Sequence, residues 1–172
     1  PPLEEVRRDL ALIKSAGFNY VRLVHSPQSA SVSRTAAEVG LFVSEEPGTC
    51  FHDLGDPSIA APALETLQRM VLRDRNCPAV FAWYIYNECH PNVAYAKQAA
   101  ALCRRLDPHC LLSFADCTYR REAINEMLVS ADLSYYGINQ YSTKPEDYVM
   151  RMEQFADRPL VFTEWGGYQL VG

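Results

Sequence analysis

The 172-residue sequence lacks the features that mark several large classes of protein. It has no apolar run close to the ~18 residues that a membrane-spanning helix needs. Its opening residues, 1–5, lack the basic head and apolar stretch of a signal peptide, so they look like a cut within a longer protein. The six cysteines form no CxxC pair, which disfavours zinc-ribbon and thioredoxin-like sites. We therefore expect no membrane partner and a largely reduced chain.

The sequence also lacks a concentration of basic charge. Its formal net charge is −5, and arginine pairs such as Arg7-Arg8 and Arg104-Arg105 stand apart from one another. Isolated pairs are typical of solvated helix faces, whereas nucleic-acid surfaces gather their basic residues. We expect no nucleic-acid partner. The cell compartment stays open, with the cytoplasm favoured, and so does a homo-oligomeric state of the full-length protein.

Three families of sequence motif are absent. No GxGxxG follows a predicted strand, which disfavours a dinucleotide-binding sheet. No GxSxG is present, so a Ser-His-Asp hydrolase is disfavoured. The four histidines lack the spacing of HExxH or of a paired zinc site. The sequence therefore predicts no cofactor and requires no metal.

What the chain does contain is a regular alternation of helical and extended patterns. Each helical stretch has apolar residues at helical spacing, and each extended stretch is a short apolar run. We predict helices near 3–16, 26–39, 64–71, 93–103, 121–129 and 146–155, and strands at 19–24, 41–43, 79–86, 110–114, 133–138 and 160–163. Ser26-Pro27 predicts the start of the second helix as a cap followed by proline, and Gly40 its end.

Alternating helices and strands indicate one α/β domain with a parallel sheet, because parallel strands need crossover connections. A doubly wound open sheet and a (β/α)₈ TIM barrel both satisfy this pattern. The barrel typically takes ~250 residues. Six strands in 172 residues thus fit about three quarters of a barrel, so the fold class predicted is an incomplete TIM barrel spanning 1–172.

Polar side chains follow every predicted strand, while the strands themselves are apolar. The residues concerned are Arg22, His25, Glu45, Glu46, Asn87, Glu88, Asp116, Asn139, Tyr141, Glu164 and Trp165. Barrel enzymes carry their catalytic groups where the strands end. Glu88 and Glu164 stand out, since a carboxylate after a buried strand is costly unless it is paired or useful. A rim salt bridge or a helix cap is the structural alternative for either one.

Five segments resemble glycoside hydrolase family 2, which includes β-galactosidases, β-glucuronidases and β-mannosidases. They are Gly17–Pro27, with its Arg…His-x-Pro turn, Gly40–Pro47, Arg73–Pro78, Phe81–Glu88 and Leu160–Gly166. The resemblance covers nearly the whole chain in the family's order. It implies that the six strands are barrel strands two to seven, without strands one and eight or the preceding β-sandwich domains. The chain is then part of a larger multidomain glycosidase, and by itself it is expected to be inactive.

The resemblance implies hydrolysis of terminal β-glycosidic bonds in a carbohydrate substrate, with Glu88 as acid/base and Glu164 as nucleophile. Such a retaining mechanism needs two carboxyl groups roughly 5–5.5 Å apart. Arg22 beside Glu164 would keep that carboxylate charged, and Tyr141 would donate a hydrogen bond to it.

Further residues are expected to bind substrate. Asn87 is expected to bind the sugar 2-hydroxyl, and Asn139 to bind substrate in the same pocket. Trp165 is expected to stack on the apolar face of the sugar. His25 binds a hydroxyl or assists a carboxylate, or merely packs at its turn. Glu46 binds hydroxyls or pairs with Arg22. Trp83 is expected in the core.

Two other functions remain open from the sequence. One is an endo-acting β-mannanase or cellulase of the same clan, which shares the Asn-Glu pair and the late glutamate. The other is a non-catalytic, carbohydrate-binding barrel piece, because an open barrel leaves two strand edges exposed. The catalytic interpretation requires Glu88 and Glu164 to meet at one end of the sheet.

Overall fold

The computed structural model describes residues 2–166, which form six parallel strands and six helices in strict alternation. The helices are α1 (Leu3–Ser15), α2 (Ala30–Val39), α3 (Pro57–Asp74), α4 (Val93–Leu106), α5 (Arg121–Ser130) and α6 (Pro145–Gln154). The strands are β1 (Tyr20–Arg22), β2 (Phe42–Glu45), β3 (Val80–Asn87), β4 (Leu111–Asp116), β5 (Tyr136–Gln140) and β6 (Leu160–Trp165). Every predicted helix and strand is present.

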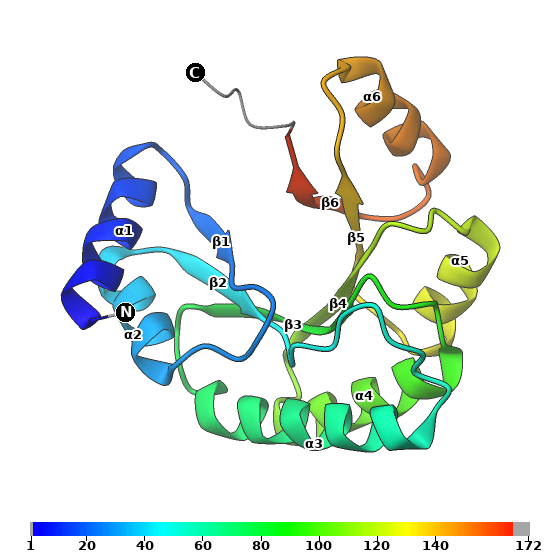
Figure 1. Cartoon of the computed structure of the whole chain (residues 1–172), viewed down its shortest axis with the longest axis horizontal. Coiled ribbons are helices and arrows are strands. Elements are labelled where there is room, and N and C mark those ends of the chain that lie inside the picture. Colours follow the sequence, from blue (N-terminus) through cyan, green and yellow to red (C-terminus); the bar gives the residue numbers. More distant parts are fainter. Residues whose placement is uncertain (1, 167–172) are drawn as a thin grey trace.

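The strands pair in sequence order, β1-β2-β3-β4-β5-β6, and every pairing is parallel. The sheet curves into an arc with the helices along its outer side, and in the described part of the chain β1 does not pair with β6 (Figure 1). This arrangement is an incomplete TIM barrel rather than a doubly wound sheet, because helices cover one side only.

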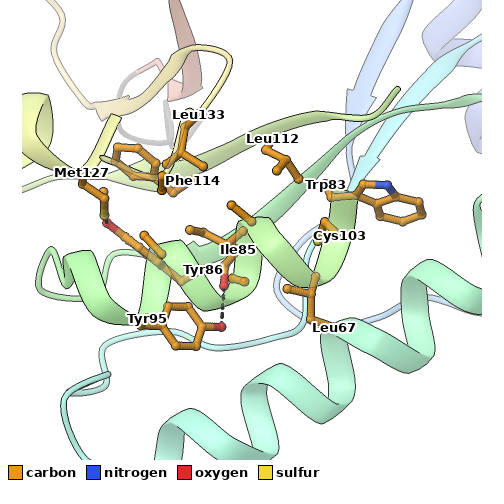
Figure 2. Close-up of a cluster of buried hydrophobic side chains, with 14 of the residues drawn as sticks. Leu67, Trp83, Ile85, Tyr86, Tyr95, Cys103, Leu112, Phe114, Met127 and Leu133 are labelled. Carbon is orange, nitrogen blue, oxygen red and sulfur yellow. Dashed lines mark hydrogen bonds between the residues drawn. The ribbon is translucent and has the colours of Figure 1, made fainter. Parts of the chain in front are cut away.

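The main core lies between the sheet and helices α3, α4 and α5. Figure 2 shows Trp83, Ile85 and Tyr86 of β3 packed among side chains of these helices and of β4. Tyr95 of α4 donates a hydrogen bond to the Ile85 carbonyl at 3.0 Å. Trp83 is fully buried, as predicted, so the indole is part of the core and not of a sugar-binding wall.

The predicted start of α2 is wrong by one short turn. Ser29, not Ser26, is the N-cap, and its Oγ accepts a hydrogen bond from the Ser31 amide. His25 and Ser26 instead form a bend before the helix, and Gln28 Nε2 donates a hydrogen bond to the Ser26 carbonyl at 3.1 Å. Both serines are good cap residues, so local preference alone does not choose between them. Gly40 ends the helix in a left-handed conformation with φ 78°, as predicted.

All six strands differ from their predicted limits by one to three residues at one end or at both. β1 is restricted to Tyr20–Arg22, shorter than the predicted 19–24, and β5 begins only at Tyr136. Before β5, Leu133 and Ser134 lie in the turn that follows α5, where the Ser134 amide binds the Leu112 carbonyl. β3 begins at Val80 rather than at 79, and its residues are buried from Ala82 onward, since Phe81 is 44% exposed.

All six cysteines are free, in agreement with a largely reduced chain. No helix among residues 2–166 has the length and hydrophobicity needed to cross a membrane.

Candidate active site

Arg22, the last residue of β1, lies at the centre of a hydrogen-bonded cluster at the carboxyl ends of the strands. Its Nη1 donates to Glu164 Oε1 at 2.6 Å. Its Nη2 donates to Glu46 Oε2 at 2.6 Å and to Asn87 Oδ1 at 2.8 Å. The side chain is only 5% exposed, so these charge-assisted bonds are shielded from water. One guanidinium therefore joins the ends of β2, β3 and β6.

Glu164, on β6, receives a second hydrogen bond from the Tyr141 hydroxyl, as the sequence predicted. Burial alone would raise the pKa of this carboxyl, but the hydrogen bonds from Tyr141 and Arg22 and the charge of Arg22 outweigh it. The pKa of Glu164 is consequently held below its ordinary value. The carboxylate is ionised at neutral pH, which is the state a nucleophile requires.

Glu46 is buried to 1% exposure and lies between two nitrogen-bearing side chains. Besides Arg22, it faces His25, whose Nδ1 is 3.2 Å from Glu46 Oε1. His25 Nε2 also lies 4.0 Å from Glu164 Oε1, while about half of the histidine side chain is exposed. Of the two roles predicted for Glu46, the structure supports the pairing with Arg22. Of those predicted for His25, it supports assistance to a carboxylate.

Glu88 follows β3 directly and is half-buried, with φ 47°. Its Oε1 accepts a hydrogen bond of 2.6 Å from Asn139 Nδ2, which lies 3.2 Å from Asn87 Oδ1. Since Asn87 also accepts from Arg22, an unbroken path of polar contacts links Glu88 to Glu164.

Glu88 and Glu164 lie at the same end of the sheet. Glu88 directly follows β3 and Glu164 is the last residue but one of β6, and both strands belong to one parallel sheet. Burial raises the pKa of the Tyr141 phenol, and the hydrogen bond to Glu164 and the negative charges of Glu164 and Glu88 raise it further.

Asp116 organises the loop after β4, a role that sequence analysis missed. The carboxylate is fully buried and accepts hydrogen bonds from the Thr118 and Tyr119 amides and from the Tyr136 hydroxyl. The Tyr119 hydroxyl in turn donates to the Asn139 carbonyl at 2.7 Å. An aspartate two residues before a threonine is a typical turn signal, and it would have predicted this loop.

Two cysteines also border the site. Asn87 Nδ2 donates to Cys50 Sγ at 3.0 Å, which satisfies the amide on the side away from Arg22. Burial, together with the nearby Glu88 and Asp116 charges, raises the pKa of the Cys117 thiol to about 11. Both thiols are therefore protonated at neutral pH. Nothing in their sequence context distinguishes them from ordinary packing cysteines.

Trp165 lies apart from the hydrogen-bonded cluster. It is 66% exposed and lines a cavity of about 570 Å³ with Tyr148 and Phe162. None of the charged or amide side chains of the cluster lines this cavity, so stacking of a sugar on Trp165 stays a prediction.

The structure thus brings together eight of the nine predicted site residues: Arg22, His25, Glu46, Asn87, Glu88, Asn139, Tyr141 and Glu164. Within residues 2–166, no group of three or more histidine, cysteine, aspartate or glutamate side chains is arranged to hold a metal ion. The set supplies three carboxylates in different environments, one fixed arginine and two amides, which are the groups that acid–base and nucleophilic chemistry uses.

The curved parallel sheet and the carboxylate cluster at its carboxyl end define the chain as a TIM-barrel domain with a site of the enzymatic type. The chain belongs to the glycosyl hydrolases family 2, TIM barrel domain, whose sequence profile matches residues 2–171.

Proteins with similar sequences support the assignment to this family. A β-galactosidase of Thermoanaerobacter pseudethanolicus is 38% identical over 104 residues, which cover 59% of this chain and 14% of that protein. A putative β-glucuronidase of Formosa agariphila is 32% identical over 84 residues, which cover 49% of this chain and 10% of that protein. The chain therefore spans a small part of the length of the curated relatives it matches.

Solved structures share the fold over nearly the whole chain. A β-glucuronidase from Ruminococcus gnavus in complex with D-glucaro 1,5-lactone superposes with a TM-score of 0.85 at 21% identity, covering 98% of this chain and 32% of that one. The apo structure of Bacteroides uniformis β-glucuronidase 3 gives 0.80 at 26% identity, covering 97% and 22%.

Proposed function

We propose that this chain is the main part of the catalytic barrel of a larger, multidomain retaining β-glycosidase, which hydrolyses terminal β-glycosidic bonds. Glu164 is the nucleophile and Glu88 the general acid/base. The observation that carries the proposal is the Arg22 cluster, which keeps one glutamate charged and connects it through two asparagines to the other. The names of the sequence relatives, β-galactosidase and putative β-glucuronidase, support the class of substrate.

The first step is displacement of the leaving group. A Glu164 oxygen attacks the anomeric carbon while the bond from that carbon to the glycosidic oxygen breaks, and Glu88 gives its proton to the departing oxygen. Arg22 and Tyr141 hold the attacking carboxylate in place through its two oxygens. Because these contacts exist before substrate binds, little reorganisation is needed during the reaction.

The second step releases the sugar. Glu88, now ionised, takes a proton from a water molecule whose oxygen attacks the anomeric carbon, and the bond to Glu164 breaks. The sugar leaves with its original configuration, and Glu88 is protonated again. Asn139 donates a hydrogen bond to Glu88 Oε1. This contact keeps the carboxyl group in place while Glu88 acts first as an acid and then as a base.

Asn87 serves the same reaction by binding the 2-hydroxyl of the sugar, a contact that strengthens in the transition state. Its amide is held on both sides, by Arg22 and by Cys50, so its orientation is fixed in advance. Glu46 pairs with Arg22, and His25 contacts Glu46 and lies 4.0 Å from Glu164, so both side chains support the arginine and the carboxylate of the nucleophile.

The decisive experiment replaces the nucleophile in the full-length parent. Glu164→Gln keeps the size of the side chain but removes its negative charge, and we expect the hydrolysis of aryl β-glycosides to fall at least ~1,000-fold. Glu153→Gln on α6, an exposed glutamate outside the cluster, is the matched control and should leave the rate unchanged. Comparable rates in the two variants would refute the nucleophile assignment.

Azide separates the two glutamates by the product that each variant forms. In Glu164→Ala, azide occupies the space of the nucleophile and should give an α-glycosyl azide directly. In Glu88→Ala, an aryl substrate with a good leaving group still forms the glycosyl-enzyme, and azide should then give the β-glycosyl azide. The same product from both variants would contradict the assigned roles. A panel containing aryl β-galactoside and β-glucuronide identifies the sugar.

A further inference from the structure

The Arg22 guanidinium has a neighbour that the catalytic proposal does not use. The ring of Tyr84, on β3, lies under the guanidinium, with 5.2 Å between the ring centroid and Arg22 Cζ. The two terminal nitrogens bind Glu164, Glu46 and Asn87, but Nε is buried and has no hydrogen-bond partner among the described residues. The electron-rich face of the Tyr84 ring stabilises this side of the cation.

Tyr84 is itself held firmly. It is fully buried, and the Tyr135 hydroxyl donates to the Tyr84 hydroxyl at 3.1 Å. The two rings meet edge to face with centroids 6.1 Å apart. Small side chains, Ala82 and Ala115, complete this cluster on the inner side of the sheet. A ring fixed in this way sets the position and the tilt of the Arg22 guanidinium that stacks on it.

We propose that Tyr84 is a positioning residue, which holds the Arg22 guanidinium in the plane that serves Glu164 and Asn87. This inference rests on the proposed function, since it assigns Tyr84 a part in the same site. An aliphatic side chain at this position would leave the cation without an electron-rich face and free to turn about its Nε bond. Both the Glu164 and the Asn87 contacts would then loosen, although neither residue is altered.

The ionisation of Glu164 reports this effect, because Arg22 is one of its two strongest supports. The other groups that face Glu164 are Tyr141 after β5 and His25 after β1. Arg22 also faces Glu46, and two further tyrosines, Tyr20 and Tyr135, lie close enough to feel its charge. Burial raises the pKa of both phenols, so they stay neutral across the working range.

The test uses the full-length parent with an aryl β-glycoside. Three replacements are made at position 84: Tyr84→Leu, Tyr84→Phe, and a trifluorinated phenylalanine, which keeps the ring's volume but weakens its negative face. The matched control is Tyr86→Leu, because Tyr86 is an equally buried tyrosine of β3 that packs in the helix-side core. Folding of each variant is checked by circular dichroism, and kcat and kcat/KM are followed across pH.

We expect Tyr84→Phe to keep the wild-type pH profile. Tyr84→Leu and the fluorinated ring should move the acidic limb of kcat/KM to higher pH and lower kcat roughly 2- to 30-fold, the range of a buried cation–π contact. The fluorinated ring decides the matter if Tyr84→Leu does not fold. An acidic limb that does not move with the fluorinated ring, or that moves equally in Tyr86→Leu, would overturn the proposal.

A failure of the proposed function is recognised separately. If the wild-type parent hydrolyses no aryl β-glycoside, the proposed activity is wrong, whatever Tyr84 does. The positioning role is then tested without turnover, by titrating the ¹³C-labelled Glu164 carboxyl by NMR in the wild type and in the fluorinated variant. A higher pKa of Glu164 in the fluorinated variant supports the role, and an equal pKa refutes it.

Discussion

At the scale of single residues, the site depends on an asymmetry between two glutamates of the same chemistry. Glu164 accepts from a buried cation and from a phenol, while Glu88 accepts from a neutral amide. Positive charge and donated hydrogen bonds favour the ionised form of a carboxyl group, and a neutral amide does so far less. These partners hold Glu164 in its ionised form, which is the state that its proposed role as nucleophile requires.

Tyr141→Phe tests this asymmetry. The pKa of Glu164 is lowered partly by the Tyr141 hydrogen bond, so removing the hydroxyl should raise it and move the acidic limb of kcat/KM to higher pH. Because Tyr141 is 53% exposed, water replaces part of the lost hydrogen bond, so kcat/KM on the acidic limb should fall by roughly 3- to 10-fold. Tyr95→Phe, which removes a buried hydroxyl from the core, is the control. If the acidic limb of kcat/KM lies at the same pH in the wild type and in Tyr141→Phe, Tyr141 does not lower the pKa of Glu164.

At the scale of elements, the helix that follows β1 provides a direct comparison of two serines. Ser29 caps α2, whereas Ser26 lies in the preceding bend. We expect Ser29→Ala to lower the free energy of unfolding by about 1 kcal/mol, because an orphan amide loses its acceptor. Ser26→Ala should change it by less than about 0.5 kcal/mol. Urea unfolding of both variants measures the difference, and equal losses would show that the cap is misplaced.

Gly137 of β5 illustrates a packing constraint between neighbouring strands. A methyl group at this position would meet the Phe114 carbonyl oxygen of β4 and the Thr163 methyl of β6. We expect Gly137→Ala to destabilise the protein by about 1–3 kcal/mol, as overpacking of a tight interior does. It should also weaken the site, because Thr163 hydrogen-bonds Asn139 at 2.6 Å.

Gly17→Ala serves as the comparison for Gly137→Ala. Gly17 has φ +92° but open space around it, so only backbone strain of about 1–2 kcal/mol is expected, with activity unchanged. Thermal unfolding and kcat/KM of the two variants separate crowding from strain. A loss of activity in Gly17→Ala equal to that in Gly137→Ala would contradict the constraint placed on β5.

The order of the helices and strands and the polar residues that follow each strand were predictable, because they depend on local patterns of apolar and polar residues. The contacts between side chains of neighbouring strands were not predictable from the sequence. Register shifts occur between Val43 and Ser44, between Tyr84 and Asn87, and between Ile138 and Asn139, all close to the site. Each shift changes which side chain points inward after it, and no local pattern records it. Tyr84 under Arg22 and Cys50 beside Asn87 both escaped prediction for this reason.

At the scale of the whole molecule, a buried carboxylate makes the stability of the fold depend on pH. Glu45 of β2 is 1% exposed and contacts Ser33 of α2 and Arg73 of α3, so it links the sheet to two helices. Its Oε2 has no hydrogen-bond partner among the described residues. Burial, reinforced by the neighbouring Asp74, raises the pKa of Glu45 to about 7, although Ser33 and Arg73 oppose the rise.

A raised pKa fixes the direction of the pH effect. Between the ordinary pKa of a glutamate and the raised value, the folded state holds a proton that the unfolded state has released. Raising the pH through this window therefore removes stability, on the order of 3 kcal/mol for a pKa of about 7. For a protein of this size that corresponds to roughly 6–12 °C in Tm.

Glu45→Gln tests this dependence, because glutamine is neutral at every pH and nearly the same size. The wild type should lose stability from pH 5 to pH 8, and Glu45→Gln should lose less. The stability of the variant relative to that of the wild type should therefore increase as the pH rises. Glu153→Gln, an exposed glutamate of α6, should follow the wild type at each pH. Thermal unfolding at four or five pH values measures all three proteins. If wild type and Glu45→Gln change in parallel, Glu45 is already ionised in the folded state at pH 5, and the ion pair with Arg73 must then outweigh the cost of burial.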